Sequence, residues 1–192
     1  VPIGWGARGV EGKIRAIQYA REHKIPYLGL CYGMQLAVVE FARNVLGWKD
    51  AHTTEVNEKT SHPVVHMIPE QNRVLENRAY GGTMRLGGWD CNVEKGTLAH
   101  SLYKQSLVSE RPRHRWEFND AYASEFAQAG LVISGRSVKE KLVELIELPT
   151  SIHPFFLGTQ GHPEYKSRPL HPHPFFVGFM EAAKQYEKNN HS

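Results

Sequence analysis

The strongest constraint on the fold is a cysteine set between two glycines, where a short apolar run meets an amphipathic stretch. Residues 27–30 are an apolar run of strand length, and Gly29, Cys31 and Gly33 form a G-x-C-x-G motif. Beyond this motif, apolar side chains recur at helical spacing, at Met34, Ala37, Val38, Phe41 and Val45. A strand, a sharp turn and a helix in this order are typical of an α/β fold.

A cysteine in such a turn projects its side chain beyond the edge of a sheet. We expect glycine at positions 29 and 33 because the backbones pass too close there for a Cβ atom. The N-terminus of the following helix would favour the thiolate of Cys31 through its dipole. For this motif alone, a small buried core cysteine beside two unrelated glycines is an equally good interpretation.

A second motif follows another strand-like run, at residues 155–160, and reads His162-Pro163-Glu164. His and Glu two positions apart on an extended chain point to the same side. Glu164 could therefore hold the His162 ring and stabilise its cation, while His162 accepts the proton of Cys31. The two motifs together favour a cysteine nucleophile over a structural cysteine.

The chain length suits one domain, and further helices and strands are expected along it. The other expected elements are helices at 10–23 and 175–186, a possible strand at 64–68, a hairpin or meander pair at 131–135 and 142–147, and a loop or short strand at 78–88. We expect Phe176, Phe179, Met180 and Ala183 to share the apolar face of the last helix. The chain opens on a glycine-rich turn with no strand before it, so we expect a fragment of a longer protein that lacks its N-terminal strand or strands.

Composition excludes several functional classes. The chain has 192 residues and a formal charge of +3, without a run of Lys or Arg that would indicate nucleic-acid binding. It has no apolar run long enough to span a membrane and no signal-peptide pattern, so we expect a cytoplasmic protein. Cys31 and Cys91 lie in no CxxC or Cys/His cluster, so neither a disulfide framework nor a metal site is expected.

The chain resembles the glutaminase domain of the CTP synthases, which are class I, triad-type glutamine amidotransferases. The resemblance runs nearly end to end and is carried by segments 8–13, 33–35, 41–45, 81–87, 162–164 and 167–169. It implies an α/β fold with a central, mostly parallel sheet flanked by helices, plus a smaller antiparallel element. Residues 1–192 would form one glutamine amidotransferase domain.

The resemblance implies a catalytic triad of Cys31, His162 and Glu164. Cys31 would attack the side-chain amide of glutamine to give a glutamyl thioester, and His162 would protonate the departing ammonia. The oxyanion would be stabilised by the backbone amide of Tyr32 and by that of a residue in the turn at 2–4, where Gly4 is the candidate.

Three further positions match residues that bind glutamine in the family, namely Gln35, Glu55 and Arg115. The ammonium group of the substrate needs a carboxylate, and its carboxylate needs a guanidinium group. Without the family, each position has an ordinary explanation. Gln35 could cap helix amides, Glu55 could lie on the surface, and Arg115 could pair with Glu117.

The resemblance also implies partners beyond this domain. In the whole enzyme, a synthase domain of the same chain would use the ammonia to aminate UTP with ATP and magnesium, in a homo-oligomer. GTP would activate glutamine hydrolysis, and Arg8, Thr83 and Arg85 match the positions expected to sense it. The domain itself would need no cofactor and no metal.

The chain departs from the family pattern at four places. Ile3 and Trp5 replace Gly and Phe in the first turn, Tyr32 replaces Leu, Pro112 interrupts a basic stretch, and Gly161 replaces an aromatic residue. If the turn required a positive φ at position 3, a β-branched Ile3 would be strained there. Gly161 is expected to loosen His162.

These departures leave two alternatives to an active glutaminase. One is a catalytically weak module that regulates or assembles a larger synthase, an interpretation motivated by Ile3, by Gly161 and by the expected lack of an N-terminal strand. The other is a related γ-glutamyl hydrolase with the same triad, against which the segments 81–88 and 167–169 argue by resemblance.

Overall fold

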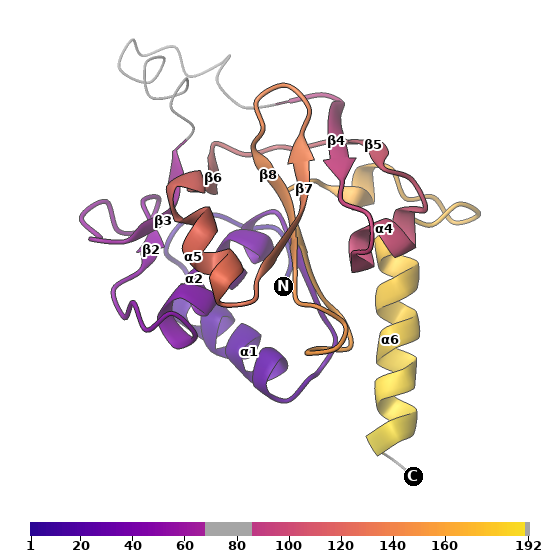
Figure 1. Ribbon diagram of the computed structural model, residues 1–192, viewed down its shortest axis with the longest axis horizontal. Helices are drawn as coiled ribbons and strands as arrows, with labels where there is room; N and C mark the ends of the chain where they lie inside the picture. Colours follow the sequence, from indigo (N-terminus) through magenta and orange to yellow (C-terminus); the bar gives the residue numbers. More distant parts are fainter. Residues whose placement is uncertain (68–85, 191–192) are drawn as a thin grey trace.

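The computed structural model describes residues 1–67 and 86–190, and its elements alternate between helices and short strands (Figure 1). In chain order they are α1 (Val10–Glu22), β1 (Tyr27–Leu30), α2 (Tyr32–Asn44), β2 (His52–Thr53), β3 (Pro63–Met67), β4 (Trp89–Val93), α4 (Leu98–Tyr103), β5 (Leu107–Glu110), β6 (Trp116–Phe118), α5 (Ala123–Gln128), β7 (Val132–Ser137), β8 (Val143–Glu147), β9 (Phe156–Thr159) and α6 (Pro174–Asn190), with 3-10 turns at Asp120–Tyr122 and Pro163–Tyr165.

A six-stranded sheet in the order β1-β9-β8-β7-β4-β5 forms the centre of the domain. The expected α/β class is confirmed, but the sheet is mixed rather than mostly parallel. Within the described strands, β1 and β9 are its parallel pair, and the other four pairings are antiparallel. Connectivity explains two of these pairings: β7, β8 and β9 follow one another through loops without a crossover helix, and such strands pair antiparallel.

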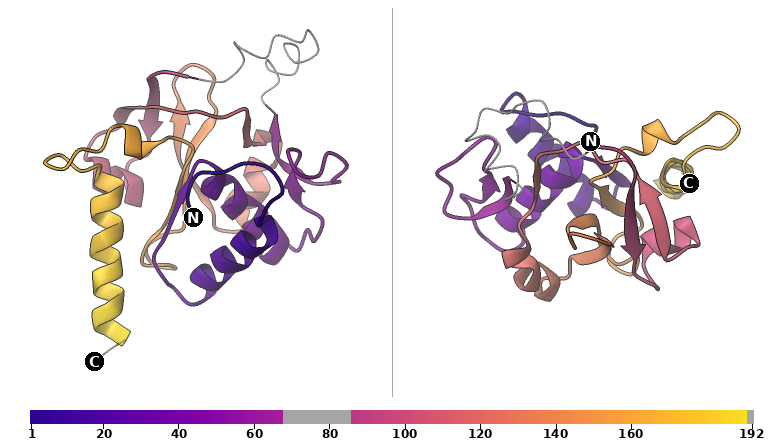
Figure 2. Two further views of the ribbon diagram at one scale, coloured as in Figure 1. Left: turned by 180° about the vertical axis from the view of Figure 1, so that it is seen from behind. Right: turned by 90° about the horizontal axis from the view of Figure 1, so that it is seen from above.

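A helix layer covers each face of this sheet. Helices α1 and α2 pack on one face, and α4 and α6 pack on the other (Figures 1 and 2). The strands between them alternate accordingly: Ile146 and Phe156 belong to the core cluster of α1 and α2, whereas Leu145 and Leu157 belong to the cluster of α4 and α6. This period of two fixes the register of the central strands, because a slip by one residue would exchange the two cores.

A smaller sheet, β2-β3-β6, lies beside α2. The expected antiparallel element is present in the β3–β6 pair, while β2 runs parallel to β3. This sheet carries the segments that hold Glu55 and Arg115, so its position determines one end of the cleft described below.

Most elements expected from periodicity lie where the sequence places them, including β1 with the same bounds and the β7–β8 hairpin. The apolar face of α6 was predicted wrongly at one position. Met180 is 65% exposed, whereas Phe175 and Gly178 are the buried residues of the helix. Gly178 faces Leu102 of α4 so closely that a Cβ atom there would lie 2.5 Å from Leu102 Cδ2.

Substituting Gly29 by alanine should lower the free energy of unfolding by roughly 1–3 kcal/mol, the usual cost of overpacking a core. A Cβ atom at Gly29 would lie 2.9 Å from both Gly33 C and Met34 N, which are backbone atoms. Gly12→Ala in α1 is the matched control, because no atom beyond its chain neighbours and the adjacent helix backbone lies within 4 Å of its Cβ position. It should stabilise the helix by up to ~1 kcal/mol. Urea denaturation measures both changes, and equal midpoints for the two variants would contradict the packing argument.

Candidate active site

The two sequence motifs meet at one edge of the large sheet. In the parallel pair, Leu30 of β1 lies opposite Thr159 of β9, so both strands end at the same level. Cys31 follows β1 directly, and its backbone N–H donates to Thr159 O at 2.7 Å. His162 follows β9 by three residues. The register of one strand pair therefore brings together residues that lie far apart in the sequence.

Cys31 lies in a strained turn, as the sequence predicted. Its φ of 51° and ψ of −100° fall in a region that non-glycine residues rarely adopt. Both neighbouring glycines are required by close contacts: a Cβ atom at Gly29 would strike backbone atoms of α2, and one at Gly33 would lie 2.2 Å from Val1 O. The turn presents the thiol to the cleft while α2 starts at the next residue.

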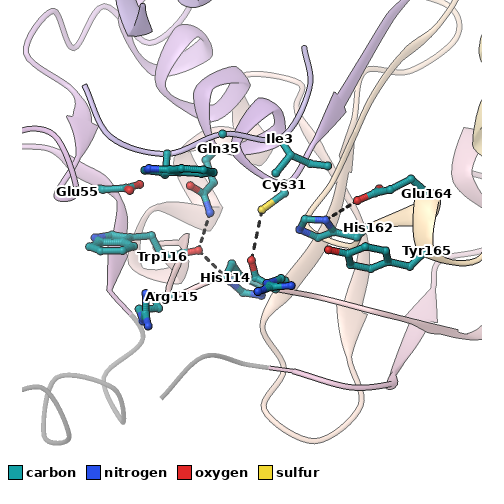
Figure 3. Close-up of a pocket in the computed structure, with 13 residues that line it drawn as sticks. Ile3, Cys31, Gln35, Glu55, His114, Arg115, Trp116, His162, Glu164 and Tyr165 are labelled. Carbon is teal, nitrogen blue, oxygen red and sulfur yellow. Dashed lines mark hydrogen bonds and ion pairs between the residues drawn. The ribbon is translucent and has the colours of Figure 1, made fainter. Parts of the chain in front are cut away.

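The His–Glu pair is formed. His162 Nδ1 lies 2.7 Å from Glu164 Oε1, and the imidazole lies between Glu164 and Cys31 (Figure 3). Its other nitrogen, Nε2, is buried and has no hydrogen-bond partner among the described residues. The Tyr165 ring stacks on the imidazole at a centroid distance of 5.2 Å. With one nitrogen and the ring plane fixed, the imidazole can exchange a proton through Nε2.

The resting cysteine is a thiol, contrary to the expectation of a helix-stabilised thiolate. Burial raises the pKa of Cys31 to about 12, and the charges of Glu164 and Glu55 act in the same direction. Hydrogen bonds from the Tyr32 amide and the Gln160 side chain act to lower the pKa, but desolvation outweighs them. A thiol with a raised pKa must lose its proton before it can act as a nucleophile.

Oppositely charged side chains line the far end of the same cleft, which has a volume of ≈ 590 Å³. Glu55 follows β2 and Arg115 precedes β6, while Cys31 and His162 line the other end (Figure 3). Burial raises the pKa of Glu55, and its Oε1 accepts the N–H of Gly6 at 3.0 Å. Glu55 is thus not a free surface residue.

Gln35 lies between the two ends of the cleft, on α2. Its Nε2 donates to Trp116 O at 2.6 Å and to Gln160 Oε1 at 3.1 Å. These bonds do not support the alternative explanation that Gln35 caps helix amides, and its role in binding glutamine stays a prediction. The side chain joins α2 to the segments that carry the two halves of the site.

The structure also places the residues that depart from the family pattern. Ile3 is absent from the described non-glycine residues with positive φ, so the strain expected at this position does not occur. Gly4 lines the cleft, and Tyr32 is buried beneath it. The backbone around Gly161 is tied to its neighbours by a bridge to Pro112 and by a hydrogen bond from His162 N–H to Arg111 O. The loosening of His162 by Gly161 stays a prediction.

Sequence reasoning missed Gln160 and Tyr165. Gln160 is fully buried, and its Nε2 lies 3.5 Å from Cys31 Sγ. Its position directly after β9 and two residues before His162 was an available signal, because residues that follow parallel strands gather at one sheet edge. Tyr165 follows Glu164 directly, but the stacking of its ring on His162 depends on a 3-10 turn that no periodicity in the sequence predicts.

Of the residues expected to sense GTP, Arg8 lies in the described part of the chain. Arg8 is exposed ahead of α1 and does not line the cleft, and Thr83 and Arg85 lie outside the described residues. No group of three or more His, Cys, Asp or Glu side chains in residues 1–67 and 86–190 is arranged to hold a metal ion. None of the helices described is both long and apolar enough to cross a membrane.

Comparison with known proteins agrees with this geometry. A family model described as glutamine amidotransferase class-I matches residues 1–182. The chain belongs to this family. The glutaminase domain of Trypanosoma brucei CTPS, in a structure with bound acivicin, matches this class I glutamine amidotransferase domain with a TM-score of 0.88 and 41% identity, covering 96% of this chain and 70% of that one. The domain is therefore a glutaminase domain of the CTP synthase type.

Curated proteins similar in sequence to this chain include CTP synthases. CTP synthases from Caldanaerobacter subterraneus and Pyrococcus horikoshii are 58% and 56% identical over 99% and 98% of this chain. The chain spans about a third of their length, at 34% and 35%.

Iodoacetamide should alkylate Cys31 at a rate that keeps rising from about pH 7 to about pH 10 in the absence of glutamine. The reason is that the reactive thiolate is a minor species below the raised pKa of the buried thiol. Peptide mapping separates Cys31 from Cys91 and gives the rate at each pH. A plateau near neutral pH would contradict the account, since it would mean that the helix N-terminus already stabilises the thiolate.

Proposed function

We propose that this domain hydrolyses the side-chain amide of L-glutamine through a thioester on Cys31. The observation that carries the proposal is one cleft with a thiol and an oriented imidazole at one end and a carboxylate and a guanidinium group at the other. Free glutamine has the matching layout, with a reactive amide at one end and a zwitterionic α-carbon at the other. Arg115 would bind its carboxylate and Glu55 its ammonium group.

The reaction proceeds in two steps. Cys31 gives its proton to His162 as Sγ bonds to the amide carbon, and the Tyr32 and Gly4 amides stabilise the resulting oxyanion. The C–N bond then breaks as His162 returns the proton to the leaving nitrogen, which departs as ammonia. Water, deprotonated by His162, attacks the thioester and releases glutamate and the free thiol. Glu164 stabilises the imidazolium in both steps.

We propose further that the ammonia serves to aminate UTP in a CTP synthase. Relatives named CTP synthase that match nearly this whole chain support this assignment. A synthase domain on the same chain, the use of ATP and magnesium, activation by GTP and a homo-oligomeric state follow from the same resemblance as predictions.

The weak-module alternative loses one of its three motivations, because Ile3 carries no positive φ. A γ-glutamyl hydrolase has less support than a glutaminase of the CTP synthase type, given the match to the Trypanosoma brucei domain. Comparing glutamine with γ-glutamyl peptides as substrates distinguishes the two activities directly.

A diazoketone analogue of glutamine should label Cys31 stoichiometrically, because the analogue places an electrophilic carbon where the amide carbon would lie. Intact mass spectrometry and peptide mapping detect the adduct. Cys31→Ala should carry no adduct and release no ammonia from glutamine, while Cys91 stays unmodified. Ammonia release that survives Cys31→Ala would refute the proposed mechanism. Acivicin, which is bound in the structure of the Trypanosoma brucei relative, can be tested in the same way as a second label for Cys31.

Glu164→Gln should lower kcat by about 10²- to 10⁴-fold with little change in KM, because His162 loses the negative charge that stabilises its cation and the acceptor-only partner that fixes its tautomer. Steady-state kinetics with glutamine measures both constants. Glu181→Gln, at an exposed position of α6, makes the same change of charge and should leave kcat unchanged. Equal kcat values for the two variants would remove Glu164 from the mechanism.

A further inference from the structure

The Tyr32 side chain packs beneath the first turn of the chain, residues 2–6. Tyr32 is 1% exposed, and a Cβ atom built on Gly4 would lie 3.2 Å from its Cδ1, so the ring lies directly against Gly4. The Tyr32 hydroxyl donates to Gly6 O at 2.6 Å. A leucine, the residue that the family pattern has here, could make the apolar contact but could not donate this bond.

The same turn is held from its other side by Glu55. The N–H of Gly6 donates to Glu55 Oε1, so both backbone polar groups of Gly6 are bound by side chains from α2 and from the segment after β2. Gly6 has a φ of 68°, a conformation that glycine adopts without strain. Trp5, which precedes it, is 80% exposed and gives the turn little packing of its own.

We infer that the Tyr32 side chain is a positioning residue that keeps Gly4 at the cleft wall, where its amide acts as an oxyanion donor. This inference rests on the proposed function, in which the turn at residues 2–4 contributes that donor. The contribution is separate from that of the Tyr32 backbone amide, which any residue would provide. Ile3 and Trp5 lie in the same turn as Gly4. The two hydrogen bonds of Gly6 hold this turn in position.

The same contacts link substrate binding to the turn. Glu55 uses one carboxylate oxygen for Gly6 N–H, which leaves the other for the ammonium group of glutamine. Burial, followed by the charge of Glu55, raises the pKa of the Tyr32 hydroxyl above its ordinary value. The hydroxyl therefore stays protonated and donates to Gly6 O throughout the pH range of a glutaminase assay.

The decisive variant is Tyr32→Phe in the full-length protein, because it keeps the ring contact with Gly4 and removes the hydroxyl alone. We expect kcat to fall about 10- to 100-fold, the scale of a misplaced catalytic group, with little change in KM. Hydrogen–deuterium exchange of peptides covering residues 2–8 should become faster.

Two further variants separate positioning from stability and from charge. Tyr103→Phe removes a buried hydroxyl that donates to Glu110 Oε1 at 3.1 Å, away from the turn, and should change neither kcat nor exchange at 2–8. Glu55→Gln keeps an oxygen for Gly6 N–H but loses the charge, so it should raise KM more than it lowers kcat.

Wild-type kcat and unchanged exchange at residues 2–8 in Tyr32→Phe would overturn the inference. So would a loss of kcat equal to that of Tyr103→Phe, because the effect would then be general destabilisation. Absence of Cys31-dependent ammonia release from the wild-type protein would instead overturn the proposed function. The exchange measurement decides in that case whether the hydroxyl holds the turn.

Discussion

Cys31 occupies a left-handed backbone conformation between the last residue of β1 and the first residue of α2, and the geometry of the site is built around it. Such a conformation costs of order 1–3 kcal/mol in a non-glycine residue. It is held by backbone bonds on both sides: Cys31 N–H donates to Thr159 O at 2.7 Å, and Gln35 N–H donates to Cys31 O at 3.2 Å. These bonds tie the nucleophile to β9 and to α2 at once, which fixes the thiol relative to the His162–Glu164 pair.

The two sheets supply different residues of the site. The large sheet supplies the nucleophile and the base, since both follow its one parallel pair of described strands. The small sheet supplies the charged residues that would bind the α-carbon groups of glutamine. Gln35 connects the two halves through Trp116 O and Gln160, so the distance between the reactive end and the binding end is set by buried hydrogen bonds. Buried polar networks of this kind fix geometry because each unpaired member would be costly.

The sequence was sufficient to predict the Cys31 turn, the His162–Glu164 pair and most elements with a clear period. Two features, the pKa of Cys31 and the pairing of the strands, could be established only from the structure. The pKa of Cys31 depends on how completely the thiol is buried, and burial outweighs the helix N-terminus that the sequence showed. The mixed sheet depends on which strands pair, and the run of β7, β8 and β9 without crossover helices makes antiparallel pairs.

Other features depend on contacts between distant residues that have no local signal. Ile3 was expected to be strained because the family has glycine at this position of the turn. In the structure the residue of this turn with a positive φ is Gly6. Tyr32 looked like a neutral replacement because only its amide was expected to matter. Its hydroxyl bond to Gly6 spans 26 positions in the chain, and no spacing rule predicts it.

The central claim is that Cys31 forms a covalent glutamyl intermediate at this sheet edge. The most direct test mixes the protein with glutamine, quenches the reaction in acid during turnover, and examines the protein by intact mass and peptide mapping. A glutamyl thioester should be found on Cys31, should disappear when glutamine is exhausted and should be absent from Cys31→Ala. Steady release of ammonia by the wild-type protein, with Cys31 unmodified at every quench time and Cys31→Ala equally active, would contradict this claim.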